Sequence, residues 1–428
     1  MGSYDVSIAC AIAAMLCIAY AGIMKKDFFH PTLFYVFCQC VTLGISYLKI
    51  TPSMTDFKIV TWYAWLGAIA AFFLGTFAYY MVCTGENKLD KEKIKEAGEA
   101  YNWHLHVVIC LVLSVLFVVG AVMVARSMGG FYLFNIGEEL NASKNASTFA
   151  NVSYASSPFV ATMWFLGAFK SINPYRRVRC FSLWAGIGII VLSMCVYPGR
   201  STLFLSLGAA FIMFNYLKAR IPVKLIVIVL AVAISSFVAV GLIRAQYGTS
   251  SLEGMSMDYV MELPYKYIAN NYWNLDYALN PPNDRERHPF TYGLDLVGVP
   301  IEYTMAPGGL RQSNGWDDFL NARIMKEQGY NTVSYLWDLY KNFGMAGCIF
   351  VPFLMAFFFS YFYEKMKVYC NPQLFVFMAI SIYQLGWNFF YASFKFGHVW
   401  LWLYIILFMH YLCKKKLRAD KSPELAQN

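Results

Sequence analysis

The segment YVMELPYKYIANNYWNLDYALN (residues 259–280) lies in the only long polar stretch of this chain, residues 244–338. HPFTYGLDLVGVPIEY (288–303) and NTVSYLWDLY (331–340) belong to the same stretch. Because it is rich in Tyr, Trp and Pro, the stretch can bury aromatic surface and fold, which disordered linkers do not do. Strongly apolar sequence lies on both sides of it. We therefore predict a folded, partly helical extramembrane loop that closes over a site formed by the surrounding spans.

Charge also separates this loop from the rest of the chain. Residues 244–338 contain twelve Asp and Glu and seven Lys and Arg, a net charge of about −5. Of the total of 25 acidic and 34 basic residues, 13 and 27 therefore lie elsewhere, about +14. These basic residues cluster in alternate short loops, so the formal net charge of +9 indicates membrane topology rather than nucleic-acid binding.

The composition is that of a membrane protein without a metal or cofactor signature. The chain is 59% hydrophobic and 14% charged, with a mean hydropathy of +0.47, whereas a soluble domain carries about a quarter charged residues. Most of the eleven cysteines lie inside apolar runs, and the 244–338 loop has none. No C-x-x-C pair and no zinc or iron–sulfur ligand spacing is present. We expect small core cysteines, no metal and no cofactor.

Apolar windows of about seventeen or more residues predict an all-α polytopic membrane protein with about eleven transmembrane helices. The fifth window is short and ends at Lys170, and the sixth and seventh are separated only by Pro198-Gly199-Arg200. We place the spans at residues 6–24, 31–48, 59–82, 105–125, 155–170, 178–197, 200–217, 221–243, 343–363, 373–391 and 397–413. The chain then divides into spans one to eight (1–243), the large loop (244–338), spans nine to eleven (339–413) and a basic tail (414–428).

Basic residues determine the predicted orientation, because short cytoplasmic loops are enriched in Lys and Arg. One set of alternate loops, together with the C-terminal tail, holds twenty basic residues, and the opposite short loops hold six. We therefore expect a cytoplasmic C-terminus, an outside N-terminus and a large loop that faces outward. Residues 84–104, rich in Lys and Glu, are expected to form a short solvated helix on the cytoplasmic side.

Two arginines are expected at the outer membrane face. Arg200 opens a span in YPGRSTLF (197–204), and Arg244 closes one in GLIRAQYG (241–248). Charges beside apolar spans are costly and often functional, although interfacial arginines can also simply extend into water. At a helix start the free N–H groups favour an anion, and guanidinium groups bind phosphate in a bidentate manner. The two arginines are therefore a candidate clamp for a phosphate or diphosphate.

Polar and aromatic residues of the loop allow two interpretations each. His288 ends a basic cluster in NDRERHPF (283–290), and Arg311 and Arg323 flank the acidic pair Asp317-Asp318. These residues form either a solvated surface with local ion pairs or contacts to a substrate. The tyrosines and Trp of 259–280 fit either a helix in the interfacial aromatic belt or a platform on which sugars stack.

YPGRSTLF (197–204), the large loop and GYNTVSYLWDLYKNFGMAGCIFVP (329–352) together resemble the Wzy-type oligosaccharide repeat unit polymerases, which are distantly similar to O-antigen ligases. The sharpest matches are the turn Gly199-Arg200-Ser201 and the pattern Asn331-Thr332 … Tyr340 … Phe343-Gly344 … Gly347. The resemblance implies a GT-C-like, metal-independent glycosyltransferase in the bacterial cytoplasmic membrane. Such an enzyme moves a growing glycan from undecaprenyl diphosphate onto a lipid-linked repeat unit, which builds O-antigen, capsule or exopolysaccharide.

The resemblance also implies roles for individual residues. Arg200 and Arg244 match the arginines that hold the lipid diphosphate, whose developing negative charge fixed cations stabilise. On this basis the expected catalytic residues are Arg200, Arg244, His288 and Asn331. The expected substrate-binding residues are Ser201, Arg311, Arg323, Tyr330, Thr332 and Tyr340. Val333 occupies the place of the histidine found in the ligases, so the base that activates the acceptor stays open between His288, Asp276 and Glu302.

The resemblance implies lipid-linked donor and acceptor oligosaccharides, membrane lipids, a chain-length regulator and a flippase as partners, and no nucleic acid. The alternatives are a ligase-like or other integral-membrane glycosyl- or acyltransferase, and a lipid-linked sugar transporter. A transporter predicts charged or broken helices near the bilayer midplane and repeat symmetry, and the sequence shows neither. Transferases that use lipid-phosphate sugars usually carry an outer acidic motif, and here the first outer loop offers only Asp56.

Overall fold

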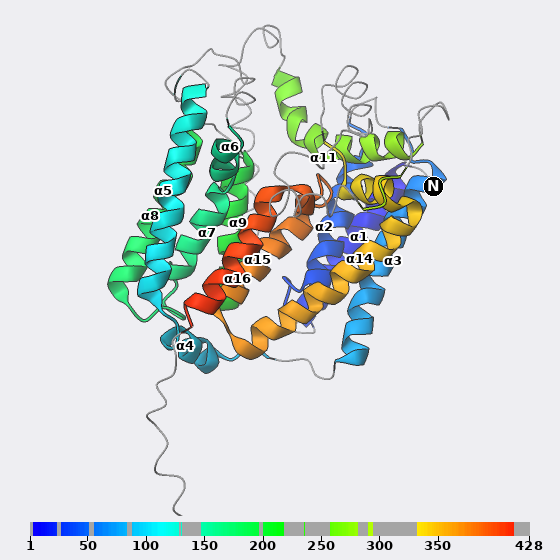
Figure 1. Ribbon diagram of the computed structural model, residues 1–428. Helices are drawn as coiled ribbons and strands as arrows, with labels where there is room; N and C mark the ends of the chain where they lie inside the picture. Colours follow the sequence, from blue (N-terminus) through cyan, green and yellow to red (C-terminus); the bar gives the residue numbers. More distant parts are fainter. Residues whose placement is uncertain are drawn as a thin grey trace, which may run out of the picture.

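The computed structural model describes residues 3–23, 27–50, 55–83, 88–127, 130, 147–196, 200–217, 235, 257–280, 290–293 and 332–414. These residues are mostly helical, with no strand among them, which confirms the all-α prediction. The helices are α1 (Ser3–Ile23), α2 (Pro31–Ser46), α3 (Ile59–Val82), α4 (Lys91–Glu99), α5 (Trp103–Ser127), α6 (Thr148–Ala155), α7 (Ser157–Ala168), α8 (Arg176–Val196), α9 (Arg200–Leu217), α11 (Met257–Leu279), α14 (Tyr335–Tyr369), α15 (Pro372–Trp387), the 3₁₀-helix η3 (Ser393–Lys395) and α16 (Gly397–Leu412) (Figure 1).

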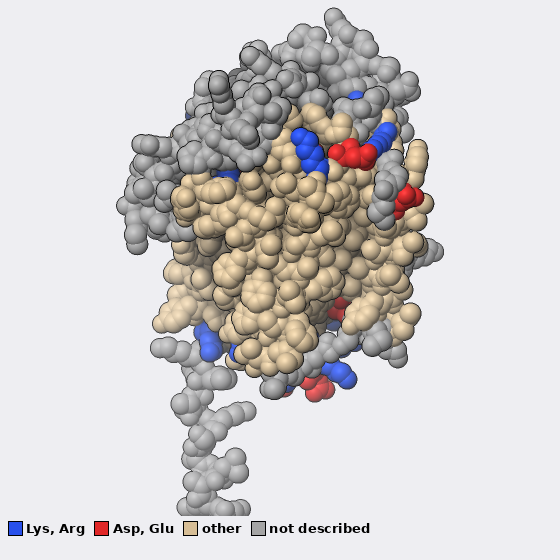
Figure 2. Space-filling model, turned by 90° about the vertical axis from the view of Figure 1, so that its right-hand side faces the viewer, with Lys and Arg blue, Asp and Glu red and all other residues tan. Residues whose placement is uncertain are grey.

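Among the described residues, five helices are long and apolar enough to cross a membrane: α1 from Tyr4 onward, α3, α5, α8 and α14. Their outward faces carry large hydrophobic side chains, such as Leu16, Phe77 and Trp184, each more than 60% exposed. So much exposed apolar surface is unfavourable in contact with water, but not in contact with the hydrocarbon of a membrane. Figure 2 shows Lys, Arg, Asp and Glu only toward the two ends of one face, with an uncharged band between them. Together these features indicate a membrane protein.

Most predicted spans lie close to observed helices. α3 and α9 coincide with the predicted spans 59–82 and 200–217. α2, the Leu203–Leu217 part of α9, and α16 are apolar but have fewer than eighteen residues. The eighth predicted span, 221–243, lies outside the described residues except for Ser235.

The fifth predicted span, 155–170, is not a single continuous helix. The chain breaks at Ser156 between α6 and α7, and every residue of α7 from Ser157 to Gly167 is buried. Twelve helical residues cover about 18 Å, which is less than the thickness of the hydrocarbon layer, about 30 Å. Helix α7 is thus a central helix packed against other helices. Gly167, which faces Ser182 of α8, is one of the small residues that allow this close approach.

Helix α14 changes direction at Gly344, where φ is 61° and ψ is −151°. Only glycine adopts this backbone conformation readily. The first limb, residues 335–343, lies across the end of the helices, and the second limb runs down through the bundle (Figure 1). Gly347 lies directly against the first limb, because a Cβ atom there would be 2.5 Å from the Leu339 carbonyl oxygen. The bend therefore accounts for two of the glycines in the 329–352 motif.

The buried hydrophobic residues form two clusters. One involves α5, α7, α8, α9, α15 and α16, and the other involves α1, α2, α3, α11 and the first limb of α14. The second cluster includes apolar residues of α11 and of the first limb of α14, the two segments that carry the candidate site described below. We call the end of the helices where α11 lies the α11 end, and the opposite end, where α4 lies, the α4 end (Figure 1).

Helix α4 bears out the prediction of a short helix within residues 84–104. Asp90 caps it, since one carboxylate oxygen accepts a hydrogen bond of 2.9 Å from the Glu92 N–H. Its charged residues are exposed, but Ile94 is buried in the hydrophobic core. The helix therefore lies on the end of the bundle with one apolar face packed, instead of being solvated all round.

Candidate functional site

Helix α11 is fastened to α2 by buried tyrosines. Tyr265 donates a hydrogen bond of 3.0 Å to the Ser46 carbonyl, and the Tyr272 hydroxyl donates one of 3.0 Å to Gln39 Oε1. Both tyrosines are buried. They therefore form neither an interfacial belt nor a sugar platform, because their rings are used to hold the loop against the membrane helices.

Asp276, one of the three candidate bases, caps a helix. One of its carboxylate oxygens accepts a hydrogen bond of 2.8 Å from the Lys58 N–H and another from the Thr61 hydroxyl. Lys58 is the N-cap residue of α3 and has no capping side chain of its own. A carboxylate supplied from α11 binds one backbone N–H there and complements the helix dipole. This geometry favours a structural role for Asp276.

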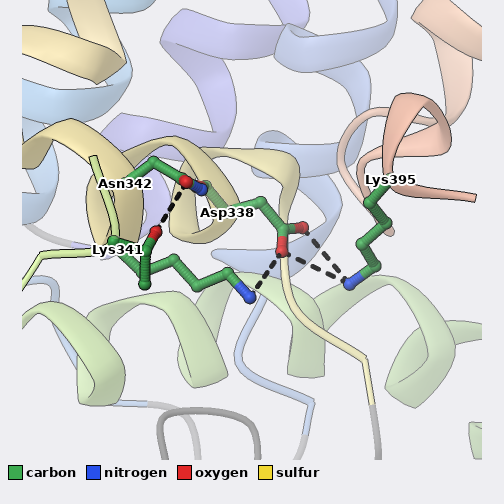
Figure 3. A network of polar contacts seen from close by, with 5 residues as sticks. Asp338, Lys341, Asn342 and Lys395 are labelled. Carbon is green, nitrogen blue, oxygen red and sulfur yellow. Dashed lines mark hydrogen bonds and ion pairs between the residues drawn. The ribbon is translucent and has the colours of Figure 1, made fainter. Parts of the chain in front are cut away.

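An ion cluster lies between the first limb of α14 and η3 at the α11 end (Figure 3). Lys395 Nζ is 3.3 Å from Asp338 Oδ2 and 3.4 Å from Oδ1. Lys341 Nζ is 3.6 Å from Asp338 Oδ1. The Asp338 and Lys341 side chains are 2% and 4% exposed, whereas that of Lys395 is 35% exposed. We call these three residues the Asp338 cluster.

Neighbouring hydrogen bonds hold the limb that carries the Asp338 cluster. Asn342 Nδ2 donates to the Asp338 carbonyl over 2.6 Å, and the Thr291 hydroxyl donates to Asn342 Oδ1 over 2.6 Å. The Thr291 and Tyr292 N–H groups donate to the Lys341 and Asn342 carbonyls over 3.1 and 3.0 Å. Residues 290–293 of the large loop are thus paired with the first limb of α14.

In the Asp338 cluster, two ammonium groups lie around one carboxylate among the described residues. Burying an ion costs several kcal/mol unless a counter-charge and hydrogen bonds compensate. Asp338 supplies that compensation for Lys341, which is almost fully enclosed. Lys395 is accessible from one side and is held in place by the same carboxylate. This arrangement suits electrostatic contact with an anion that approaches from the α11 end.

Arg200 lies at the same end as the Asp338 cluster. It is the first residue of α9, as predicted, although the side chains of Arg200 and Ser201 are outside the described residues. Phe204, one turn along α9, stacks on Trp387 with ring centroids 6.4 Å apart. The next residue, Asn388, accepts a hydrogen bond of 3.0 Å from the Tyr335 N–H. The start of α9 is therefore joined by two contacts to the start of α14.

Two other predicted site residues are described. The Thr332 carbonyl accepts a hydrogen bond of 2.7 Å from Asn274 Nδ2. Tyr340 is half-buried, with its ring 6.3 Å from that of Trp337 and 6.0 Å from that of Phe290. The remaining predicted site residues and the candidate base Glu302 lie outside the described residues: Arg244, His288, Asn331, Arg311, Arg323 and Tyr330.

A second polar cluster lies at the α4 end. Tyr363 and Asn215 each donate a hydrogen bond of 2.8 Å to the Asp27 carboxylate, and Tyr80 donates one of 2.9 Å to Glu364. Burial raises the pKa of Asp27, although these hydrogen bonds oppose the shift. Lys367 pairs with Glu364 over 2.7 Å. These contacts join the α1–α2 connection to α9 and α14, and α3 to α14, near one end of the bundle.

No group of His, Cys, Asp and Glu residues suited to hold a metal ion occurs in the described part of the chain. Comparison of the chain with protein-family models, with curated proteins and with solved structures finds no match. A function must therefore be inferred from the residues and their geometry.

Proposed function

We propose that this protein is a membrane glycosyltransferase that polymerises oligosaccharide repeat units carried on undecaprenyl diphosphate. The observation that carries the proposal is the Asp338 cluster, which holds Lys395 in a fixed, partly accessible position. Cleavage of a glycosyl–diphosphate bond places negative charge on the leaving diphosphate, and preorganised cations stabilise that charge. Asp338 and Lys341 of this cluster lie within the 329–352 motif, at the end of the bundle where Arg200 begins α9.

The reaction is a displacement at the anomeric carbon. An acceptor hydroxyl oxygen forms a bond to that carbon, the bond to the diphosphate oxygen breaks, and the diphosphate leaves with the electron pair. Lys395, Arg200 and Arg244 bind the diphosphate, while Asp338 positions Lys395 and neutralises Lys341. The hydroxyl proton passes to a base, for which His288 and Glu302 are the candidates once Asp276 is engaged in capping α3.

We further propose a GT-C-like arrangement of about eleven spans in the bacterial cytoplasmic membrane, in which α6 and α7 together make up the fifth. The α11 end would face outward, with the N-terminus outside and the C-terminus in the cytoplasm. The distribution of twenty basic residues against six in the two sets of short loops supports this orientation. Lipid-linked donor and acceptor, a flippase that delivers them and a chain-length regulator are the partners expected of such an enzyme.

The positions of the charged residues favour a transferase over a transporter. In the described membrane helices, every Asp, Glu, Lys and Arg lies toward a helix end, and none lies near the middle. Transporters usually bind their substrate near the bilayer midplane. A transferase that uses lipid-phosphate sugars is also disfavoured, because Asp56 is paired with Lys49 over 2.7 Å. A ligase-like enzyme shares the proposed chemistry and differs only in its acceptor.

A gel assay separates polymerase from ligase. Full-length protein in proteoliposomes is incubated with the lipid-linked repeat unit extracted from the cells that produce it, and EDTA is added. A ladder of glycans that differ by one repeat unit supports the polymerase. Transfer of one unit to a different lipid or sugar, without a ladder, would replace it with a ligase-like enzyme.

A further inference from the structure

Residues 290–293 of the large loop pack on the bend of α14 through two reciprocal contacts between a phenylalanine and a glycine. A Cβ atom on Gly344 would lie 3.0 Å from the Phe290 ring, and one on Gly293 would lie 2.8 Å from the Phe343 ring. Two backbone hydrogen bonds to the first limb hold the same segment. The position of the segment on the bend is therefore set by both main-chain and side-chain contacts.

Three aromatic rings at this contact remain exposed. Phe290 is 39%, Phe343 is 40% and Tyr292 is 77% exposed. The Phe290 and Tyr292 rings meet edge to face, with centroids 6.4 Å apart. We call these three residues the aromatic patch. Single exposed hydrophobic residues are common, but a group of large rings at one contact indicates an interaction surface.

The ring of Tyr292 is carried on an unfavourable backbone conformation. Its φ is 49°, in the left-handed region that bulky residues avoid, and φ of the following Gly293 is 87°. Turns with two successive positive φ values prefer Asn-Gly. Because the ring is mostly exposed, burial within the chain does not offset this conformation. The ring is therefore placed for contact with something outside the chain.

The surface that adjoins the aromatic patch is the apolar outer face of α14 and α3. After Phe343, the next exposed residues of α14 are Ala346, Ile349 and Phe350. Ile349 lies against Gly67 of α3, where a Cβ atom would be 3.2 Å from it. Residues 343–363 contain no Asp, Glu, Lys or Arg, whereas the first limb carries two charged residues of the Asp338 cluster. The bend thus marks the boundary between the apolar span and the polar limb.

We propose that the aromatic patch inserts into the headgroup boundary of the lipid bilayer and anchors this segment of the large loop to the membrane. Tyrosine is enriched at that boundary, because its ring is apolar and its hydroxyl can stay hydrated. The two phenylalanines continue the lipid-facing surface of α14, so the bilayer that covers this surface also reaches the patch. The inference requires only a membrane and does not depend on the proposed reaction.

The anchor also sets the depth of the Asp338 cluster. Asp338 precedes Gly344 by six residues, about 9 Å of helix. The first limb lies across the end of the helices rather than along them (Figure 1), so its residues share a similar depth. The headgroup layer on each side of a bilayer is about 5–7 Å thick. The patch therefore holds the cluster near the level of the lipid phosphate groups.

Fluorine NMR measures the contact with lipid directly. Tyr292, or Phe343 in a second protein, is replaced by trifluoromethylphenylalanine in the full-length chain in lipid nanodiscs. Spin labels are attached to the lipid chains either next to the headgroup or at the chain end, and a nickel chelate is the probe dissolved in water. Both fluorine signals should be lost to broadening by the label next to the headgroup, and the chain-end label and the chelate should broaden them less.

Two exposed positions calibrate the depth. Glu92 lies among the charged residues of α4 and should respond most to the chelate. Trp184, near the middle of α8 and 66% exposed, should respond most to the chain-end label. Each labelled protein should melt at the temperature of the unaltered protein, because the replaced side chains are all partly or mostly exposed.

The comparison with these positions decides the proposal. Signals at 292 and 343 that respond like that of Glu92 would overturn the anchor, because the patch would then face water. Signals that respond like that of Trp184 would overturn the headgroup position and place the patch in hydrocarbon. Signals that no probe broadens would also overturn the anchor, since the patch would then be covered by the chain itself.

Discussion

Lys395 Nζ lies 3.3 Å from Asp338 Oδ2, so the connection between α15 and α16 is joined to the first limb of α14 by an ion pair. The two partners differ in exposure, with Asp338 2% and Lys395 35% exposed. The carboxylate is thus a fixed internal support, and the ammonium group is the part that a ligand can reach. This division of roles underlies the first two predictions.

Lys395→Gln should abolish most of the glycosyl transfer while the protein still folds. Loss of one preorganised charge at a developing anion typically lowers kcat by about 10²- to 10³-fold. Lys395→Arg keeps the charge and should retain more activity than the Gln variant. The rate is measured as glycosidic bonds formed per enzyme in proteoliposomes.

Lys365→Gln is the control for that experiment. Lys365 lies at the α4 end of α14, with Nζ over the rings of Tyr361 and Tyr369 at 5.3 and 5.2 Å. It should leave the transfer rate unchanged, although it removes the same charge. Equal rates for the Lys395→Gln variant and the unaltered protein would exclude Lys395 from the diphosphate site.

Asp338→Asn should destabilise the fold more than it alters substrate binding. It removes the carboxylate next to the enclosed Lys341, and breaking a buried ion pair costs about 3–5 kcal/mol. Adding Lys341→Met to Asp338→Asn should restore part of the loss, since the buried ammonium group that lost its Asp338 carboxylate is then gone. Thermal unfolding of the single and double variants, followed by tryptophan fluorescence, measures this coupling. A double variant no more stable than Asp338→Asn would argue against it.

Gly344→Ala should destabilise the bend in α14. A non-glycine residue at φ 61°, ψ −151° costs about 1–3 kcal/mol, and the new methyl group would lie 3.0 Å from the Phe290 ring. Gly188→Ala in α8 is the comparison, because a Cβ there meets nothing within 4 Å. That variant should be as stable as the unaltered protein or more so. Similar melting temperatures for the two variants would contradict the inferred strain.

Asp27→Asn should raise stability at neutral pH. Because burial raises the pKa of Asp27 in the folded protein above the ordinary value of 3.8, the folded state binds this proton more tightly than the unfolded state. Stability contributed by the protonated form is therefore lost as pH rises from about 3.8 through the folded pKa. The Asn variant should lack that loss. Melting temperatures from pH 4 to 8 that fall in parallel for both proteins would refute the assignment.

The sequence predicted those helix boundaries that depend on the local pattern of apolar residues and helix breakers. Helix α3 matches its predicted span because an uninterrupted apolar run is itself the signal, and α9 begins at Arg200 because Pro198-Gly199 ends the preceding run. Apolar patterning could not show that α7 is enclosed, since residues that face lipid and residues that face other helices have the same composition.

The site was less accessible from the sequence because its contacts are long-range. Lys395 and Asp338 are 57 residues apart, and neither stands out in a list of charges beside spans. Asp276 looked like a candidate base because the sequence does not show that its carboxylate reaches Lys58 and Thr61 of α3. One feature of the sequence could have pointed to Asp338 and Lys341, because both lie in the 329–352 motif that carries the resemblance.

The central claim is glycosyl transfer with a diphosphate leaving group, and counting that leaving group tests it most directly. Proteoliposomes are given the lipid-linked repeat unit in EDTA, and undecaprenyl diphosphate and new glycosidic bonds are quantified in the same samples by mass spectrometry. The account predicts one undecaprenyl diphosphate released for each bond formed, with both rates falling together in Lys395→Gln. Glycosidic bonds formed without release of undecaprenyl diphosphate, or repeat units that cross the bilayer unchanged with neither product, would contradict it.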